Sequence, residues 1–291
     1  MPAAPDPILR EFYRHCRRIH RRHDPTYYWA TRRLPAEIRP AVHAIYAFVR
    51  LMDEIVDGPQ RPPDPAARRA ALDGWELVLA DAVRGDGAHA HPVVAALADA
   101  GRRHRLPLGE LRLYFDSMRK DSEPVRVQTW DELELYMRGS AGSVGRILAA
   151  LLDVPAERRS EFASLALAFQ LTNLVRDVRE DWDLDRVYLP AEDFEYFGVS
   201  VDQIGRRDLT PGFRRLVALE VERARLLFRA SASAADGVAP GVRRGMRLAR
   251  SVYLGVLDRT ERLDFDVLDR RPSLPPWEMA HAIAGALRSG S

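Results

Sequence analysis

The stretch Asn173-Leu174-Val175-Arg176-Asp177-Val178-Arg179-Glu180-Asp181 carries three polar side chains that repeat every four residues. On an α-helix, residues i and i+4 lie on the same face, about 6 Å apart along the axis. Asn173, Asp177 and Asp181 therefore form a row of oxygen atoms along one side of a helix predicted over 158–182. A solvated charge run would be polar all round, and Leu174, Val175 and Val178 between them disagree with that. Such a row suits a hard cation such as Mg²⁺.

A second acidic stretch, Asp53-Glu54-Ile55-Val56-Asp57, lies about 120 residues earlier in the chain. Its two aspartates also stand four residues apart, and like charges at that spacing destabilise a helix. Arg50 is the only basic residue at helical spacing on the face of either pair. One such pair is explained by a solvated helix end. Two pairs on apolar helices favour a divalent cation that offsets the repulsion.

Helical periodicity extends over nearly the whole chain, and no alternating strand pattern of useful length is present. Asp64 and Thr129 are predicted N-caps, and Pro35 is placed in the first turn of the second helix. The linkers are short, so the sequence predicts one all-α domain over 1–291. The predicted helices cover 8–19, 36–56, 66–84, 92–104, 108–118, 130–152, 158–182, 211–233, 240–262 and 276–288.

Composition excludes several classes of protein. The 291 residues are 46% hydrophobic, and the net charge is only +2 with both signs interspersed, so a nucleic-acid partner is not expected. A single cysteine, Cys16, excludes an internal disulfide and a cysteine zinc site. No apolar run is long enough to span a bilayer. We expect a cytoplasmic protein, with peripheral association with the inner membrane face left open.

The chain resembles the squalene/phytoene synthase family of head-to-head isoprenyl diphosphate synthases. The resemblance extends over about 170 residues and is strongest in the second acidic stretch and the segment after it. Five ordered segments carry it: Thr26-Tyr27-Tyr28-Trp29-Ala30-Thr31-Arg32-Arg33-Leu34-Pro35, Tyr46-Ala47-Phe48-Val49-Arg50 before the first aspartates, Tyr136-Met137-Arg138-Gly139-Ser140-Ala141-Gly142-Ser143-Val144-Gly145, Gln170 through Asp181, and Arg186-Val187-Tyr188-Leu189-Pro190.

The resemblance implies the all-α isoprenoid synthase bundle, in which two aspartate motifs face each other across the mouth of a central apolar cavity. It also implies three Mg²⁺ ions, with Mn²⁺ as the alternative, that bridge the enzyme to the substrate diphosphate. The implied metal ligands are Asp53, Asp57, Asn173, Asp177 and Asp181. The catalytic residues are then the four aspartates together with Tyr188.

A further set of side chains is predicted to bind the prenyl diphosphate. Arg50 has an alternative explanation as the partner of Asp53 in an i,i+3 salt bridge. The small residues of 139–150 are expected to leave room for the prenyl chains, although close helix packing explains them equally well. The predicted substrate-binding residues are Thr26, Tyr28, Arg50, Gln170, Arg176, Glu180, Arg186, Tyr253, Ser140 and Val144.

The implied reaction begins with ionisation of an allylic diphosphate to a carbocation. The C2=C3 bond of a second prenyl diphosphate attacks that cation and gives a cyclopropylcarbinyl diphosphate, which rearranges to phytoene, squalene or dehydrosqualene. Glu54, Arg179 and Asp185 depart from the common family pattern. They leave open an alternative in which one prenyl group moves to an aromatic small molecule. A third hypothesis is an inactive family member that acts as a binding partner.

Overall fold

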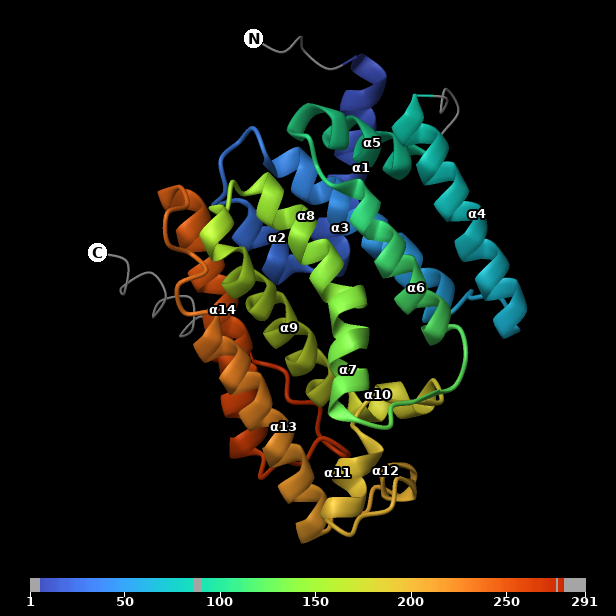
Figure 1. Ribbon diagram of the computed structural model, residues 1–291, viewed down its shortest axis with the longest axis vertical. Helices are drawn as coiled ribbons and strands as arrows, with labels where there is room; N and C mark the ends of the chain where they lie inside the picture. The colour runs from blue at the N-terminus through green and yellow to red at the C-terminus, as the bar shows by residue number, and fades with distance from the viewer. Residues whose placement is uncertain (1–5, 86–90, 276, 280–291) are drawn as a thin grey trace.

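The computed structural model describes residues 6–85, 91–275 and 277–279, and α-helices dominate these residues (Figure 1). The all-α prediction is confirmed. The α-helices are α1 (Pro7–His23), α2 (Pro25–Thr31), α3 (Arg39–Val56), α4 (Pro65–Arg84), α5 (Pro92–His104), α6 (Leu111–Asp121), α7 (Trp130–Met137), α8 (Ser143–Leu151), α9 (Arg159–Arg176), α10 (Val178–Asp183), α11 (Ala191–Tyr196), α12 (Asp202–Arg206), α13 (Pro211–Ala230) and α14 (Pro240–Arg262).

Short elements complete the chain. Two 3₁₀ turns, η1 (Leu108–Glu110) and η3 (Ala156–Arg158), precede α6 and α9, and a π-helix, η2 (Arg138–Gly142), joins α7 to α8. The strands β1 (Val125–Arg126) and β2 (Arg186–Val187) pair in parallel. The strand β2 begins the segment 186–190, which resembles the family's active-site lid and is called the lid segment below; the sequence predicted no helix there.

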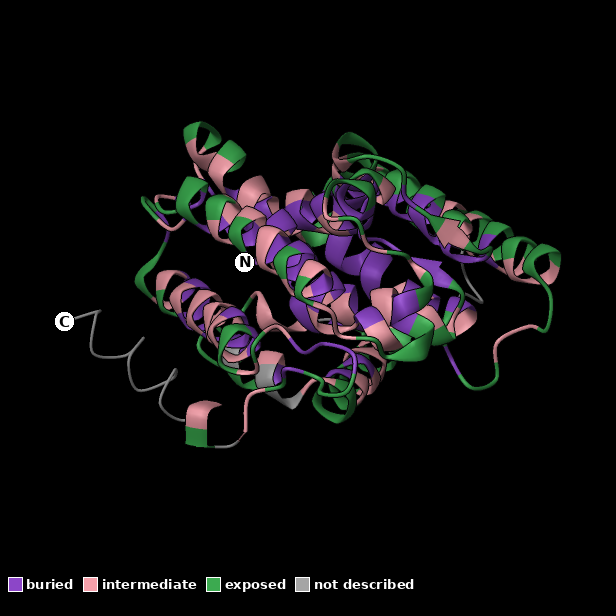
Figure 2. Cartoon of the chain, turned by 90° about the horizontal axis from the view of Figure 1, so that it is seen from below, coloured by how far each residue is buried: buried purple, intermediate pink, exposed green. Residues whose placement is uncertain are grey.

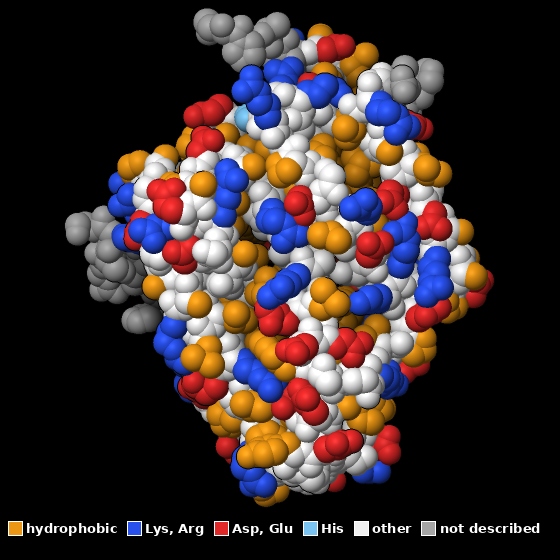
Figure 3. All heavy atoms as spheres, in the orientation of Figure 1, with side chains coloured by type: hydrophobic (Ala, Val, Ile, Leu, Met, Phe, Trp, Pro, Cys, Tyr) orange, Lys and Arg blue, Asp and Glu red, His pale blue; other side chains and the backbone are white. Residues whose placement is uncertain are grey.

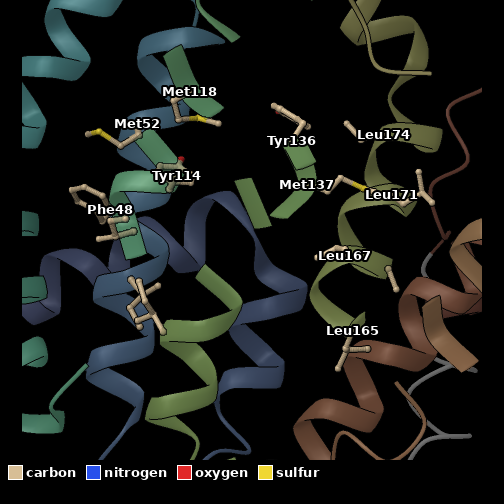
Figure 4. Close-up of a cluster of buried hydrophobic side chains, with 14 of the residues drawn as sticks. Phe48, Met52, Tyr114, Met118, Tyr136, Met137, Leu165, Leu167, Leu171 and Leu174 are labelled. Carbon is tan, nitrogen blue, oxygen red and sulfur yellow. The ribbon is translucent and has the colours of Figure 1, made fainter. Parts of the chain in front are cut away.

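The core is built from helices that turn their apolar faces inward (Figure 2). The helix α3 packs against α1 and α5, and α9 packs against α13, α14 and α8. Phe48, Met52 and Tyr114 come from α3 and α6, whereas Met137 and Leu171 come from α7 and α9 (Figure 4). All five side chains are buried. The two acidic stretches are thus placed on two separate walls of the bundle.

The helix starts agree with the sequence in two places and disagree in one. Asp64 and Thr129 accept hydrogen bonds from the backbone N–H groups of Ala67 and Glu132, as predicted for N-caps. The placement of Pro35 in a helix is wrong. Its carbonyl accepts from the N–H of Ile38 in a separate turn, and α3 begins only at Arg39 with Pro40 in its first turn.

Two predicted long helices are interrupted, and α2 was not predicted at all. The helix predicted over 130–152 contains the π-helix η2, and the helix predicted over 158–182 is divided at Asp177, where φ is −104° and ψ is 15°. Hydrogen bonds from the Asp177 N–H to Asn173 and from the Asp181 N–H to Asp177, both 2.8 Å, cross the break. The row of polar side chains therefore survives the interruption. Of the helix predicted over 276–288, all but 277–279 lies outside the described residues.

Candidate active site

The first acidic motif lies at the C-terminal end of α3, and its two aspartates contact different partners. Asp53 accepts a hydrogen bond of 2.9 Å from the hydroxyl of Tyr114, which comes from α6. Asp57 is the C-cap residue of α3, is exposed, and forms an ion pair with the buried guanidinium of Arg186. The partner of Asp57 thus comes from a segment 129 residues later in the chain.

Arg50 does not form the salt bridge with Asp53 that was its alternative explanation. It pairs instead with Glu54 one turn later on α3. Glu54 is therefore engaged by Arg50 on a half-buried part of the helix surface, while Asp53 is left to Tyr114. Phosphate binding by Arg50 stays a prediction.

The second acidic motif lies at the junction of α9 and α10. Asn173 is half-buried, its Oδ1 atom is buried without a hydrogen-bond partner, and its side chain bonds to that of Tyr253 on α14. The structure therefore brings Tyr253, one of the predicted substrate-binding residues, to the motif. An unsatisfied buried oxygen is rare, and an absent cation is one explanation of it.

Asp177 is held by arginines from two elements. Arg176 donates to it from the preceding residue, with an Nε to Oδ1 distance of 2.8 Å, and Arg271 donates at 2.7 and 2.9 Å. Arg271 also contacts Glu180 at 3.2 Å. None of these partners stands at helical spacing on the face of its aspartate pair, because Arg176 is the neighbouring residue and Arg271 comes from a distant part of the chain.

A buried cluster joins the first motif to the end of α6 and to the lid segment. The carboxylate of Asp121, at the end of α6, accepts hydrogen bonds from Tyr188 at 2.7 Å and from Tyr136 at 2.8 Å. The guanidinium of Arg186 donates to the carbonyls of Asp121 and Val56 as well as to the carboxylate of Asp57. Arg186 and Tyr188, both predicted from the lid segment, therefore meet the first motif through Asp121.

The strand pair explains how the lid segment reaches this position. Val125 pairs with Arg186 and Arg126 with Val187. Because β1 follows α6 closely in the chain, this pairing holds β2 near the end of α6. Asp185, which stands where the family commonly has glycine, adopts a left-handed conformation with φ of 61° and is paired with Arg126. Aspartate tolerates this region better than most residues. The departure at Asp185 thus retains a glycine-like turn.

Crowded negative charge is the main electrostatic property of the site. Burial, reinforced by Asp57, raises the pKa of Asp53 to about 7. Burial, reinforced by Asp177, raises the pKa of Asp181 to about 8, with smaller contributions from Asp57 and Asp121 and an opposing one from Arg186. Burial also raises the pKa of Asp121 to about 6. The two motifs and Asp121 are therefore close enough to interact electrostatically.

The remaining predicted substrate-binding residues occupy varied positions. Gln170 is half-buried on α9, and Val144 is half-buried on α8. Ser140 lies in the π-helix with a buried, unpartnered hydroxyl. Tyr28 is buried away from the aspartates, beside His20 and His43. The side chain of Thr26 lies outside the described part of the chain.

Some of the small residues serve helix packing. A Cβ atom on Gly139 would meet Ser117 of α6 at 2.2 Å, and one on Gly145 would meet Ala166 of α9 at 2.8 Å. These two glycines allow the α7–η2–α8 wall to approach its neighbours closely. The packing explanation therefore holds at these positions, and space for prenyl chains stays a prediction for the others.

The predicted metal ligands are all oxygen atoms, the type of ligand that a hard cation such as Mg²⁺ prefers. They comprise carboxylate oxygens and the unpartnered amide oxygen of Asn173, with no thiolate or imidazole among the predicted ligands. In the described part of the chain, no three His, Cys, Asp or Glu side chains converge in a way that could already hold a metal ion. Asp57 and Asp177 are instead neutralised by arginines. Metal binding would require these ion pairs to open or adjust.

Comparison with known proteins places this geometry in a family. The sequence model described as squalene/phytoene synthase matches residues 20–278. The chain belongs to the squalene/phytoene synthase family. It is 34% identical to a phytoene synthase of Thermus thermophilus over 283 residues, covering 96% of this chain and 92% of the relative. It is 32% identical to a 15-cis-phytoene synthase of Synechocystis, covering 94% and 83%.

Solved structures of squalene and dehydrosqualene synthases share the fold. A squalene synthase from Alicyclobacillus acidocaldarius is 31% identical with a TM-score of 0.80, covering 89% of this chain and 96% of that one. A dehydrosqualene synthase in complex with a ligand gives a TM-score of 0.86 at 24% identity, covering 97% of both chains. At that identity the second comparison supports the fold alone.

Family membership makes this chain a prenyltransferase that uses isoprenyl diphosphates. Squalene/phytoene synthases use a divalent metal to ionise the diphosphate. The relatives lend no support to transfer of a prenyl group to an aromatic acceptor or to membrane association. No helix in the described ranges is long and apolar enough to cross a bilayer.

Sequence reasoning missed four residues of this site: Tyr114, Asp121, Tyr136 and Arg271. Asp121 follows Arg119 and Lys120 and reads as part of a surface charge run. Tyr114 and Tyr136 lie at core positions of their helices, where an aromatic residue needs no further explanation. No local signal distinguishes Arg271 from the many other arginines in the chain, because its contact with Asp177 is purely tertiary.

Proposed function

We propose that this squalene/phytoene synthase couples two prenyl diphosphates head to head, with phytoene as the expected type of product. The observation that supports the proposal is the position of Arg186, which pairs with Asp57 of α3, donates to the backbone carbonyl of Asp121, and lines the same small cavity as Asp181 of α10. The walls contributed by α3, α6, α7 and α9 are apolar (Figure 4).

We assign the metal ligands to Asp53, Asp57, Asn173, Asp177 and Asp181. Bound Mg²⁺, with three ions as the expected number, would neutralise charge on the leaving diphosphate as its bond to carbon breaks. Two of the five ligands, Asp53 and Asp181, carry raised pKa values because burial, and after it the neighbouring carboxylates, disfavour their ionised forms. Cations at this position would relieve the crowding and favour the ionised carboxylates.

The arginines that now pair with the aspartates are well placed to hold the diphosphate. Arg176 and Arg271 converge on Asp177, and Arg186 pairs with Asp57. With the carboxylates committed to a cation, these guanidinium groups would be free to contact the phosphate oxygens in a bidentate manner. Arg50 of α3, which pairs with Glu54, would also contact the diphosphate once that ion pair opens.

The apolar walls have a chemical role of their own. A carbocation near the motifs reacts with any water that reaches it, so the prenyl chains need a dry environment. Phe48 and Leu171 are fully buried and carry no lone pair that could capture the cation. The walls therefore direct the cation toward the double bond of the second substrate.

Product analysis tests the proposal directly. We expect the purified chain, given geranylgeranyl diphosphate and Mg²⁺ without another acceptor, to yield a C40 hydrocarbon or its cyclopropyl diphosphate in the organic extract. With farnesyl diphosphate the corresponding product has C30, and the comparison of the two rates identifies the preferred chain length. Turnover that requires an added aromatic acceptor would overturn the proposal.

A further inference from the structure

A cavity of about 270 Å³ lies at the outer side of α1, α2 and the start of α3, apart from the aspartate motifs. Three arginines, Arg17, Arg32 and Arg39, contribute to its wall together with Tyr28 and His43. A site needs only about 10–15 Å³ of such volume to hold one water molecule, so this cavity accommodates a group of several heavy atoms. The cavity is thus large enough for a phosphate or diphosphate group.

The positive charge of this cavity is not balanced by carboxylates. No acidic residue contributes to its wall, and none of the three arginines has a carboxylate partner within the described residues. Elsewhere most of the described arginines are paired, and Lys/Arg and Asp/Glu side chains alternate over the visible face of the molecule (Figure 3). An unbalanced group of guanidinium charges around a hollow is therefore a local exception.

Neutral contacts position these arginines. The Nε atom of Arg17 donates to the hydroxyl of Tyr28 at 3.0 Å, and that of Arg39 donates to the carbonyl of Leu34 at 2.7 Å. The guanidinium of Arg32 lies 4.7 Å from the ring centroid of Trp29. These contacts order the side chains without cancelling their charge.

The backbone adds to the positive potential. Arg39 and Pro40 form the first turn of α3, an 18-residue helix whose N-cap residue, Ile38, makes no side-chain capping hydrogen bond. The N-terminal end of such a helix carries a partial positive charge. His43 on the same wall is kept neutral, because burial and the neighbouring Arg17 and Arg39 lower its pKa to about 4.

We propose that this arginine-lined cavity is a second anion site, which binds a phosphate or diphosphate group independently of the reacting site. Guanidinium groups bind phosphate oxygens in a bidentate manner, and three of them converge here. The bound group belongs either to free diphosphate in solution or to the headgroup of an anionic phospholipid. The inference uses no step of the proposed reaction and stands or falls separately from it.

Buried aromatic side chains separate this site from the aspartates. His43 contacts His20 with an Nδ1 to Nδ1 distance of 2.9 Å, and His20 stacks on Tyr46 with ring centroids 4.0 Å apart. Tyr46, at the far side of this stack, lies on α3 two turns before Asp53, and the charge of Asp53 contributes to the raised pKa of Tyr46. The ring signals of His43 and His20 are therefore reporters that lie between the two sites.

The test is a titration of the full chain, labelled with ¹⁵N-histidine, with inorganic diphosphate in the presence of EDTA. We expect saturable shifts of the His43 ring signals, with affinity reduced about tenfold in Arg17→Ala and in Arg32→Ala, since each loses a charged hydrogen bond to phosphate. Both side chains are exposed, so these variants should keep the fold, which thermal melts would verify. Arg112→Ala, an exposed arginine on α6, is the matched control and should bind as wild type does.

Vesicles separate the two sources of the ligand. Binding to phosphatidylcholine vesicles only when they contain phosphatidic acid, lost in the same two variants, identifies a lipid headgroup, whereas shifts with free diphosphate identify the soluble ion. Shifts that persist unchanged in Arg17→Ala and Arg32→Ala would originate at the aspartates and overturn the proposal. Absence of both the shifts and vesicle binding would overturn it as well.

Discussion

Asp121 shows how one buried carboxylate organises the site at the residue scale. Two tyrosine hydroxyls donate to its two oxygens, and its backbone carbonyl accepts from Arg186. The result is a rigid connection between α6 and the lid segment. Its importance follows entirely from these tertiary contacts.

We expect Asp121→Asn to lower kcat about 10–100-fold with a smaller change in KM, as is usual for residues that support metal ligands. The amide keeps the volume of the carboxylate but loses the charge that balances Arg186. Its NH₂ group, a hydrogen-bond donor, would also face a tyrosine hydroxyl that donates to Asp121 in the wild type. Steady-state kinetics with the prenyl diphosphate measure the effect. Tyr136→Phe, which removes one donor to Asp121, should show a smaller loss, and equal losses would contradict this order.

Replacing a predicted metal ligand is a more severe change. Asp53→Ala and Asp177→Ala should each reduce Mg²⁺-dependent turnover by about 100-fold or more while the helical circular dichroism stays unchanged. Asp131→Ala, an exposed aspartate on α7, is the control. Near-normal activity in either site variant would refute the metal assignment.

At the scale of elements, the contact of α8 with α9 depends on the absence of a side chain at Gly145. A Cβ atom there would lie 2.8 Å from the Cβ atom of Ala166. We expect Gly145→Leu to lower the free energy of unfolding by about 1–3 kcal/mol in chemical denaturation, because the two helices must separate.

Gly74 provides the matched control for this prediction. It lies inside α4, where a Cβ atom would meet nothing within 4 Å. Gly74→Ala should raise the free energy of unfolding by about 0.5–1 kcal/mol, since alanine favours a helix over glycine. If Gly145→Leu were also stabilising, the close approach of α8 and α9 would not matter for the fold.

A buried carboxylate connects α13 with α11. Glu220 is fully buried and pairs with Arg223, which also holds Asp193 of α11. Burial raises the pKa of Glu220 from 4.5 to about 8. The folded state therefore retains a proton that the unfolded state releases near its ordinary pKa, so this group makes stability fall as the pH rises between about 4.5 and 8.

The slope of this loss approaches about 1.4 kcal/mol per pH unit inside the window. Denaturation at several pH values should show that Glu220→Gln loses less stability than wild type as the pH rises from 5 to 8. The same pH dependence in both proteins would show that Glu220 is not the source of the loss.

At the scale of the whole molecule, metal and diphosphate should hold the two acidic motifs together. A ligand that binds only the folded state at 100 times its Kd stabilises it by about 2.7 kcal/mol. We expect Mg²⁺ with diphosphate to raise Tm beyond the effect of diphosphate with EDTA, and Asp177→Ala to lose this additional rise. An equal rise with EDTA would contradict a metal-bridged site.

We further propose that the whole chain forms one domain. A continuous buried core joins residues from Cys16 on α1 to Leu268 beyond α14, and the motifs of the site come from both halves of the sequence. Limited proteolysis should therefore yield no stable fragment that contains only one acidic motif.

The sequence alone determined the helical class, two helix caps and the identity of the acidic motifs, because these depend on spacing along one helix. Apolar residues at helical intervals and aspartates four residues apart can be recognised without any tertiary contact. The family resemblance added the lid segment with Arg186 and Tyr188, and the comparisons confirmed that family.

The tertiary structure alone decided which charges meet. Arg186 reaches Asp57 across 129 residues, Arg271 reaches Asp177 across 94, and Asp121 gathers two tyrosines from separate elements. The breaks at η2 and Asp177 were likewise visible only in the structure. Burial and the approach of distant charges set the pKa values and the ion pairs, and neither is encoded in the local pattern of residues.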